Sequence, residues 1–573
     1  MSKPSYHLQI NSSWMGTNSM LPIHFLFAGR IIWAILFTVL TFTISGCGRA
    51  DSTSERKEVA AEQVTSEPAN SDSQQAGDSQ LKLPAQTKER LPQSDQSLTA
   101  PAVGDSQPNK DDVGGSAAGG RVGGQETSST GYRLPKLRMA PADSVLAQHG
   151  LRKVESRRLI LITDSDDRAL DQLPGLANQL FEALQEWFGE LPPAADGSDF
   201  QVLGHVMIDR DKFRSAGLLP DESFTIRHGR HRRYAFWAGY PDTDYYRRHL
   251  ALHEFVHCYM TCENRVFDVP PPWYLEGMAE LFGTHRIEPP PSDGFTSAAR
   301  PTADQAAAVQ ATFGVMPESA AGFEGWGRIR AIREGFSDGD HDQLSELQIP
   351  TFEQVVPQVV AVFESPFQYS SSWAVCWFLK HHPDAAAVMP ALAKQRTYPG
   401  FLAEWERQQN DMGNRLAVDW LLFCEQLDFG FDADRCFPKH SETTPSPSQV
   451  KDGSATVRIT AQQGWQDSTV VVRSGATIDF RCDGRCVMNE TTKPWESTPN
   501  GLSIEYYRGN RLGQVVAVLV SSNGKKITDR IPIGASAKFT ANFDGRIWLQ
   551  VNDAVSTRTS NSGKYEVQLE WSE

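Results

Sequence analysis

The chain has 573 residues, a length that allows two or more domains with separate hydrophobic cores. Its formal net charge of −15 argues against nucleic acid as the main partner, because phosphate binding needs concentrated lysine and arginine. The eight cysteines are too few and too irregularly spaced to indicate a disulfide scaffold or a cysteine-based zinc site. Globular enzymes and binding proteins remain as the function classes to consider.

The N-terminal region has the pattern of an export signal. An uncharged apolar run at residues 31–44 ends at small residues that precede Cys47. The stretch Ile-Ser-Gly-Cys resembles the lipobox of bacterial lipoproteins, in which the cysteine carries the lipid and becomes the mature N-terminus. The resemblance implies that residues 1–47 are a lipoprotein signal peptide. It also implies a lipid-anchored protein of the cell envelope that faces the periplasm or the exterior. A membrane-spanning helix is the alternative.

Residues 48–131 form a segment of low complexity. They are rich in serine, glutamine, glycine, proline and acidic residues and contain almost no large apolar side chains. Such a segment cannot bury enough apolar surface to offset the entropy lost on ordering. We therefore predict a disordered tether that holds the folded part away from the membrane surface.

The first folded domain is predicted at residues 132–440. Runs rich in apolar and β-branched residues predict strands, and apolar residues at helical spacing predict helices. The predicted strands are residues 158–164, 200–209 and 232–240, and the predicted helices are residues 169–188, 245–262, 370–382 and 401–427. Strands that precede a long helix indicate a mixed α+β layer.

A linker rich in proline and serine is predicted at residues 441–454. From residue 455 to residue 573 the pattern changes to short alternating strands. Asn-Gly at Asn523 and Asp-Gly at Asp544 are hairpin turn signals. This region predicts a small all-β sandwich domain, with a β-barrel as the alternative.

The segment HEFVH carries the main chemical signal. His253 and His257 are four residues apart, so on a helix both side chains project from one face, one turn apart. Two imidazoles at this spacing can chelate a metal ion, and a catalytic zinc needs a third protein ligand. Glu254 lies next to this face, where a general base can take a proton from water without binding the metal.

The third ligand is predicted on the next helix, which begins after three prolines at residues 270–272. Eighteen residues separate His257 from Glu276. This spacing resembles the gluzincin metallopeptidases, including peptidase-MA-like domains, whose second helix reads W-x-x-E-G-x-A-E. The matching residues here are Trp273, Glu276, Gly277, Ala279 and Glu280. The resemblance implies an α+β zincin-like domain with Zn²⁺ held by His253, His257 and Glu276. It also implies Glu254 as general base and a peptide or protein as substrate.

Two further residues are candidates for the same site. Glu280 lies one turn beyond Glu276, where it could accept a hydrogen bond from a ligand imidazole; a solvated position is the alternative. The segment around Tyr369 resembles the one that follows the glutamate helix in peptidase-MA-like domains. That likeness implies Tyr369 as the donor that holds the oxyanion, whereas a packed aromatic anchor is the alternative.

Other polar residues are interpreted as structural. The basic stretch at residues 227–233 could engage a substrate carboxylate, but we favour a solvated hairpin tip. Cys258 and Cys262 are predicted to be buried apolar cysteines. Four histidines lack a recognisable spacing to the motif and are treated as ordinary: His249, His285, His381 and His382.

The C-terminal region contains an Asn-Asp turn at residues 552–553 and an Asn-Ser-Gly turn at residues 561–563. With these turns it resembles the calcium-dependent, galactose-binding lectins of certain bacteria. The resemblance implies that Asp553, Thr557 and Asn561 hold Ca²⁺, which would bind carbohydrate. Ser560 departs from the family's usual asparagine or aspartate. A spacer or docking module without calcium is the alternative. Cys482 and Cys486 could close a small disulfide loop in an oxidising compartment.

The sequence therefore predicts an exported, membrane-tethered zinc metallopeptidase with a lectin-like β-domain. Its partners would be a peptide or protein substrate, the membrane and a carbohydrate, without nucleic acid. A catalytically inactive surface binding protein is the alternative, with recognition carried by the β-domain. A structural lipoprotein of the cell envelope is a third interpretation, which leaves the metal constellation as coincidence.

Overall fold

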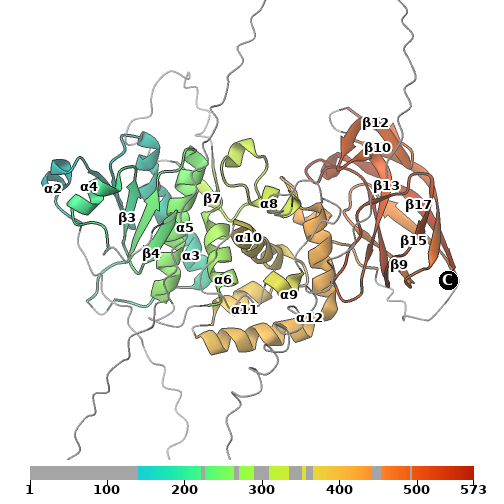
Figure 1. The fold of residues 1–573 in the computed structure, drawn as a ribbon, viewed down its shortest axis with the longest axis horizontal. Coiled ribbons are helices and arrows are strands. Elements are labelled where there is room, and N and C mark those ends of the chain that lie inside the picture. Colours follow the sequence, from blue (N-terminus) through green and yellow to red (C-terminus); the bar gives the residue numbers. More distant parts are fainter. Residues whose placement is uncertain are drawn as a thin grey trace, which may run out of the picture. The chain divides into compact units, whose positions relative to one another are not determined.

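The computed structural model describes segments of the chain between residues 140 and 572 (Figure 1). The described residues are 140–194, 196–220, 226, 228–263, 270–288, 309–334, 351–355, 366–395, 397–441, 453–490 and 493–572. The predicted signal peptide, Cys47 and the predicted tether lie outside these residues. Within them, no helix has both the length and the apolar character needed to cross a membrane.

A five-stranded sheet forms the N-terminal part of the described chain. Its order is β1(Arg152–Glu155), β2(Leu159–Thr163), β3(Val202–Met207), β5(Ala235–Gly239) and β4(Gly229–Arg232). The central strands β2, β3 and β5 run parallel, and the outer strands β1 and β4 are antiparallel to their neighbours. Every residue of β2 and β3 is buried, as expected for parallel strands covered on both faces. The three predicted strands are confirmed as β2, β3 and β5.

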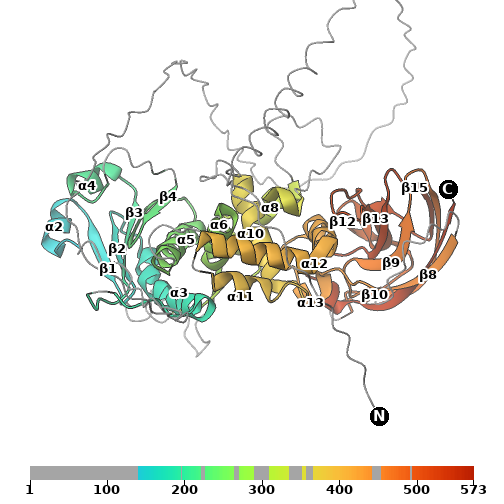
Figure 2. The ribbon, with the colours of Figure 1, turned by 90° about the horizontal axis from the view of Figure 1, so that it is seen from below.

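Helices cover both faces of this sheet (Figure 2). Alternate residues of β2 belong to different hydrophobic clusters: Leu159 and Leu161 to one, Ile160 and Ile162 to the other. The first cluster includes α3(Leu173–Phe188) and α5(Asp244–Glu263), and the second includes α2(Asp143–Gln148) and α4(Arg210–Ser215). The predicted helix at residues 169–188 begins as a 3-10 helix, because Pro174 occupies the first turn of α3.

Helix α10(Pro366–His381) lies at the centre of the helical region and contacts α6(Pro272–Gly283), α8(Arg328–Glu334), α9(Phe352–Val355) and α11(Val388–Ala393). Helix α12(Tyr398–Gln426) contacts α8, α9 and α11, and the short α13(Ala433–Cys436) follows it in the chain. A Cβ atom at Gly277 would lie 2.5 Å from Ser372 O and 2.5 Å from Cys376 Sγ, so only glycine allows α6 to approach α10 this closely. The predicted helix at residues 401–427 is present as α12, with a kink at Gly413, whose φ is 58°.

The C-terminal part is rich in β-strands. One sheet has the order β11(Trp495–Ser497), β10(Thr477–Met488), β17(Ser562–Ser572) and β8(Gly453–Thr460), with β15(Ser536–Thr540) also paired to β10. The other has the order β12(Asn500–Tyr507), β13(Asn510–Val520), β16(Gly545–Val551) and β9(Gln466–Val472), with β14(Ile531–Pro532) also paired to β13. The paired strands in both sheets are antiparallel, and the two sheets share one hydrophobic cluster. The described chain thus has mixed α+β content with a β-rich C-terminal region.

Strand β13 of the second sheet is buried on both faces along most of its length. On β13, Val515, Ala517 and Leu519 join the cluster shared by the two sheets. The alternate residues Val516, Val518 and Val520 join the cluster of the helical region instead. The run of apolar residues along β13 follows from this double burial.

Cys482 and Cys486 do not form the loop considered from the sequence. Both lie on β10, which pairs with β17 without interruption from Cys482 to Cys486. Four residues of extended strand separate their Cα atoms by about 13 Å, far beyond the limit of about 7 Å for a disulfide. Both thiols are free.

Candidate metal centre

The three predicted zinc ligands lie on two neighbouring helices. His253 and His257 occupy successive turns of α5, and Glu276 lies near the start of α6. Both histidines are buried, and their Nε2 atoms are 3.0 Å apart. Oε2 of Glu276 lies 3.3 Å from Nε2 of His253 and 3.2 Å from Nε2 of His257. The fold therefore brings the three side chains to one point, with their donor atoms facing each other.

The size of this triangle fits zinc. Tetrahedral zinc with ligand bonds of about 2.0–2.1 Å holds its donor atoms about 3.3–3.4 Å apart. The three observed separations, 3.0, 3.2 and 3.3 Å, are close to that value. A hydrogen on either Nε2 can point at only one of the other two atoms, whereas a single cation can accept electron pairs from all three. Two imidazole nitrogens and one carboxylate oxygen are also donors that zinc prefers.

The local charges favour a cation at the centre of the triangle. Burial by itself would raise the pKa of Glu276, but the charge of His257 and hydrogen bonds from both histidines hold that pKa below its ordinary value. Burial opposes protonation of His253, yet its hydrogen bond to Glu276 and the charge of Glu280 raise its pKa to about 9. Burial lowers the pKa of His257. A metal ion that binds here would replace protons that the cluster otherwise attracts.

Glu254 lies beside the triangle, on the same helix. Its side chain is buried, and its Oε2 atom has no hydrogen-bond partner among the described residues. His231 Nδ1 lies 3.4 Å from this atom, within ion-pair distance but without hydrogen-bond alignment. A carboxylate oxygen without a competing donor has the lone pair that a general base needs.

The backbone of β4 holds the Glu254 carboxylate in place. A Cβ atom at Gly229 would lie 2.2 Å from Glu254 Oε1, so strand and carboxylate can approach this closely only with glycine. We expect Gly229→Ala to displace the Glu254 side chain while the protein stays folded, because a flexible carboxylate moves more easily than backbone. If Glu254 is the base that the sequence predicts, the predicted hydrolysis should fall at least about tenfold with zinc content unchanged, since misplacing a catalytic group by 1 Å can cost about 100-fold.

The matched control for this substitution is Gly239→Ala on the neighbouring strand β5. A Cβ atom at Gly239 would lie 3.5 Å from His228 O, an ordinary contact distance. Activity and metal content measured side by side should separate the two variants. Equal activity in both would contradict the positioning of Glu254 by β4.

Glu280 connects the triangle to a buried ion-pair network. Arg328 donates two hydrogen bonds to its carboxylate, at 3.0 and 2.8 Å, and His249 Nε2 lies 3.2 Å from Oε2. His253 Nδ1 lies 3.5 Å from Oε1, too poorly aligned to count as a hydrogen bond. Burial would raise the pKa of Glu280, but the charges of Arg328 and His249 hold it well below its usual value. Glu280 is therefore buried and paired, and the solvated alternative is wrong.

Tyr369 lies next to the same cluster. It belongs to the first turn of α10, its ring centre is 6.4 Å from that of His253, and the Arg328 guanidinium is 5.5 Å from its ring. Burial and the charge of Glu276 raise the pKa of Tyr369, so its hydroxyl keeps its proton and can donate a hydrogen bond. The location suits an oxyanion donor, and that role stays a prediction.

Three residues at this site were missed from the sequence: His231, His249 and Arg328. The basic stretch interpreted as a hairpin tip contains the edge strand β4, on which Gly229 and His231 are partly buried and the intervening arginine is exposed. That alternation was the available signal for His231. His249 lies one turn before His253, which was the signal for its position. Nothing in the sequence linked Arg328 to Glu280.

A further set of donor groups lies elsewhere, around His382, Asp384 and Asp419. His382 Nε2 is 3.0 Å from Asp419, and His382 Nδ1 accepts the backbone N–H of Asp384. Both ring nitrogens are therefore used within the protein, and this set is interpreted as structural.

The predicted calcium residues also come together, but they bond to each other. Asp553 accepts hydrogen bonds from Thr557 Oγ1 at 2.9 Å and from Asn561 Nδ2 at 2.6 Å. Asn561 Oδ1 accepts the backbone N–H of Asn489. The buried guanidinium of Arg558 donates to the carbonyl oxygen of Asp553. These oxygens are occupied, so the turn does not fit calcium as it stands, and calcium binding there stays a prediction.

No protein-family model matches the chain, and no curated protein matches it. Among solved structures it is similar to the EclA N-terminal domain, a PllA-like lectin, with a TM-score of 0.17 and 15% identity, over 21% of this chain and 96% of that chain. It is also similar to PliG of Aeromonas hydrophila, a periplasmic inhibitor of g-type lysozyme, with a TM-score of 0.13 and 6% identity, over 24% of this chain and 97% of that chain. TM-scores this low carry no argument about fold or function.

Proposed function

We propose that the chain is a zinc-dependent peptidase in which His253, His257 and Glu276 hold the metal and Glu254 is the general base. The observation that carries this proposal is the donor triangle of 3.0–3.3 Å. Glu254, with an unpartnered oxygen, lies beside it on the same helix. Metal ligands and a base in this arrangement are the parts needed for metal-assisted hydrolysis.

An extended peptide is the substrate that the surrounding fold favours. Within the described residues, β4 is the edge strand of its sheet and pairs only with β5. The free edge of such a strand presents backbone N–H and C=O groups, to which another extended chain can bond. Because Gly229 of β4 lies against Glu254, a peptide paired with β4 would run past the base.

The side chains divide the reaction between them. Zinc, when bound, supplies a Lewis acid that polarises a carbonyl group and acidifies a water molecule. Glu254 would accept a proton from the attacking water on Oε2 and pass it to the leaving amine. Tyr369 would donate a hydrogen bond from its hydroxyl group to the carbonyl oxygen of the scissile bond, which gains negative charge during the reaction. Glu280, held by Arg328, would attract His253 through its charge, with Oε1 3.5 Å from Nδ1.

The proposal includes the zincin-like character of α5 and α6, lipidation at Cys47 and attachment to the cell envelope. Those features rest on the sequence motifs alone. Carbohydrate binding by the C-terminal region is not included, because the oxygens of Asp553 and Asn561 are already hydrogen-bonded.

Metal removal tests the proposal directly. The purified protein should contain one tightly bound zinc per chain and cleave an unstructured fluorogenic peptide. A chelator should abolish cleavage, and added zinc should restore it. Magnesium and calcium should not restore it, since both prefer oxygen ligands over imidazole.

Glu276→Gln supplies the matched variant for this experiment. It keeps the size of the side chain but removes the negative charge that binds zinc, so both metal and cleavage should be lost. A wild-type protein that contains no zinc, or that cleaves equally well after chelation, would overturn the proposed function.

A further inference from the structure

A second pair of metal-binding groups lies next to the first site. His231, Glu254 and His257 each offer a donor atom within 4.8 Å of the other two. His257 Nε2 already belongs to the zinc triangle. His231 and Glu254 are therefore the donors that remain for a second ion.

The distance between these donors fits zinc as well as the first site does. His231 Nδ1 lies 3.4 Å from Glu254 Oε2. Tetrahedral zinc with bonds of about 2.0–2.1 Å separates its ligand atoms by about 3.3–3.4 Å. Histidine nitrogen and carboxylate oxygen are both zinc donors.

The fold holds His231 and Glu254 close together but leaves Oε2 of Glu254 without a hydrogen-bond partner among the described residues. Gly229 and His231 are partly buried, alternate residues of β4, and Gly229 lets the strand approach the Glu254 carboxylate. The His231 ring is stacked on that of His257, with ring centres 4.3 Å apart, which fixes its orientation. Glu254 is buried, and its Oε2 has no hydrogen-bond partner among the described residues. A buried carboxylate oxygen without a partner is costly unless something binds it.

We propose that His231 and Glu254 form a second, weaker zinc site that switches the peptidase off when zinc is in excess. The inference rests on the proposed function for its regulatory meaning, because Glu254 cannot act as a base while it binds a metal. The second ion has two protein ligands where the first has three, and the two dications repel each other at short range. The first site therefore fills at lower zinc concentrations than the second.

The inference can be tested independently of activity. Zinc is titrated into the metal-free full chain, and binding is measured by isothermal titration calorimetry. The wild type should bind two zinc ions, one tight and one weak. His231→Phe keeps an aromatic ring against His257 but has no ligand nitrogen, so the weak event should be lost, or weakened at least about tenfold, with the tight one kept. Glu254→Gln should show the same loss, since a carboxamide is a poor zinc ligand.

Arg232→Phe is the matched control, because Arg232 is the next residue of β4 and is exposed. It should bind two zinc ions like the wild type.

Cleavage by the wild type should decrease over the zinc range in which the second ion binds.

The outcomes separate the two proposals. A wild type that binds a single zinc, or a weak event that persists in His231→Phe, would overturn the second site and leave the peptidase proposal intact. A chain that binds no zinc would overturn both.

Discussion

Glu254→Gln is expected to lower the rate of peptide cleavage by about 10²–10⁴-fold while the tightly bound zinc is retained. The carboxamide fills the same space but cannot accept the proton of the attacking water. The three proposed zinc ligands are His253, His257 and Glu276, so zinc binding at that site should be unaffected. Cleavage rate and zinc content should be measured on the same preparation.

Two further variants serve as controls for Glu254→Gln. Glu182→Gln changes an exposed glutamate on α3 and should leave both cleavage and zinc unchanged. Glu276→Gln should lose both. If Glu254→Gln cleaves at the wild-type rate, the base lies elsewhere and the role assigned to Glu254 is wrong.

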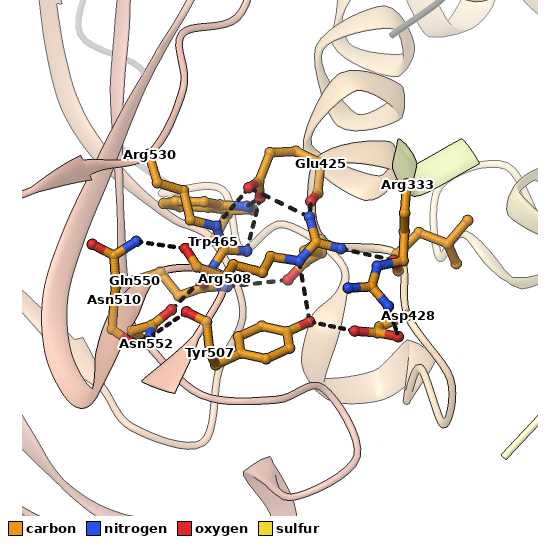
Figure 3. A network of polar contacts seen from close by, with 12 residues as sticks. Arg333, Glu425, Asp428, Trp465, Tyr507, Arg508, Asn510, Arg530, Gln550 and Asn552 are labelled. Carbon is orange, nitrogen blue, oxygen red and sulfur yellow. Dashed lines mark hydrogen bonds and ion pairs between the residues drawn. The ribbon is translucent and has the colours of Figure 1, made fainter. Parts of the chain in front are cut away.

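The second large effect is expected at the contact between the helical region and the β-rich region (Figure 3). Glu425, near the end of α12, accepts hydrogen bonds from Arg530 Nε at 2.6 Å, Arg530 Nη2 at 3.1 Å and Trp465 Nε1 at 2.9 Å. Arg508 donates to the backbone oxygens of Glu425 and Leu427. Arg508 Nη1 also lies 3.8 Å from Glu425 Oε1, so this buried carboxylate forms ion pairs with two arginines of the β-rich region.

Glu425→Ala is expected to destabilise the protein by about 3–5 kcal/mol, because it leaves buried positive charge without its partner. Trp465 would lose its hydrogen-bond acceptor as well. Urea unfolding followed by tryptophan fluorescence should show the loss as a lower midpoint. The separate hydrophobic cluster shared by the two C-terminal sheets should let the β-rich region stay folded when this contact is weakened.

Asp411→Ala is the matched control, since Asp411 lies on the same helix and forms an exposed ion pair with Arg407. Its effect should stay below about 1 kcal/mol. An equal loss of stability in both variants would contradict the importance of the buried network.

The stabilisation by Glu425 should also depend on pH. Burial would raise the pKa of Glu425, but the charges of Arg530 and Arg508 hold it below its ordinary value. A lowered folded-state pKa means that the stabilisation is present above the unfolded value of about 4.3 and is lost as the pH falls through the folded value. The difference between wild type and Glu425→Ala should therefore shrink in acid.

Local patterns were sufficient to predict most of the strands and helices around the site, though not β4. The apolar runs that became β2, β3 and β5 are strands whose central residues are buried. The four-residue spacing of His253 and His257 fixed their common face as soon as α5 formed. The prolines before Trp273 likewise fixed the start of α6. Each of these predictions depends on neighbours within a few positions, which a sequence shows directly.

Contacts between distant segments could not be predicted in this way. Arg328 meets Glu280 across 48 positions of sequence, and His231 meets Glu254 only because β4 lies antiparallel at the edge of its sheet. The basic stretch was therefore interpreted as a solvated turn, although one of its histidines, His231, lies beside the candidate metal ligands. The hydrogen bond between Asp553 and Asn561 was likewise not visible in the sequence, and calcium binding at these residues stays a prediction.

The sequence by itself determined which residues could bind a metal and which could act as a base, because donor chemistry and helical spacing are local properties. Only the tertiary structure decided three contacts. Glu276 meets the histidine pair, Gly229 lies against the Glu254 carboxylate, and Glu425 connects the helical region to the β-rich region. Those distances depend on how helices and sheets pack, and packing is set by the whole buried core rather than by any one segment.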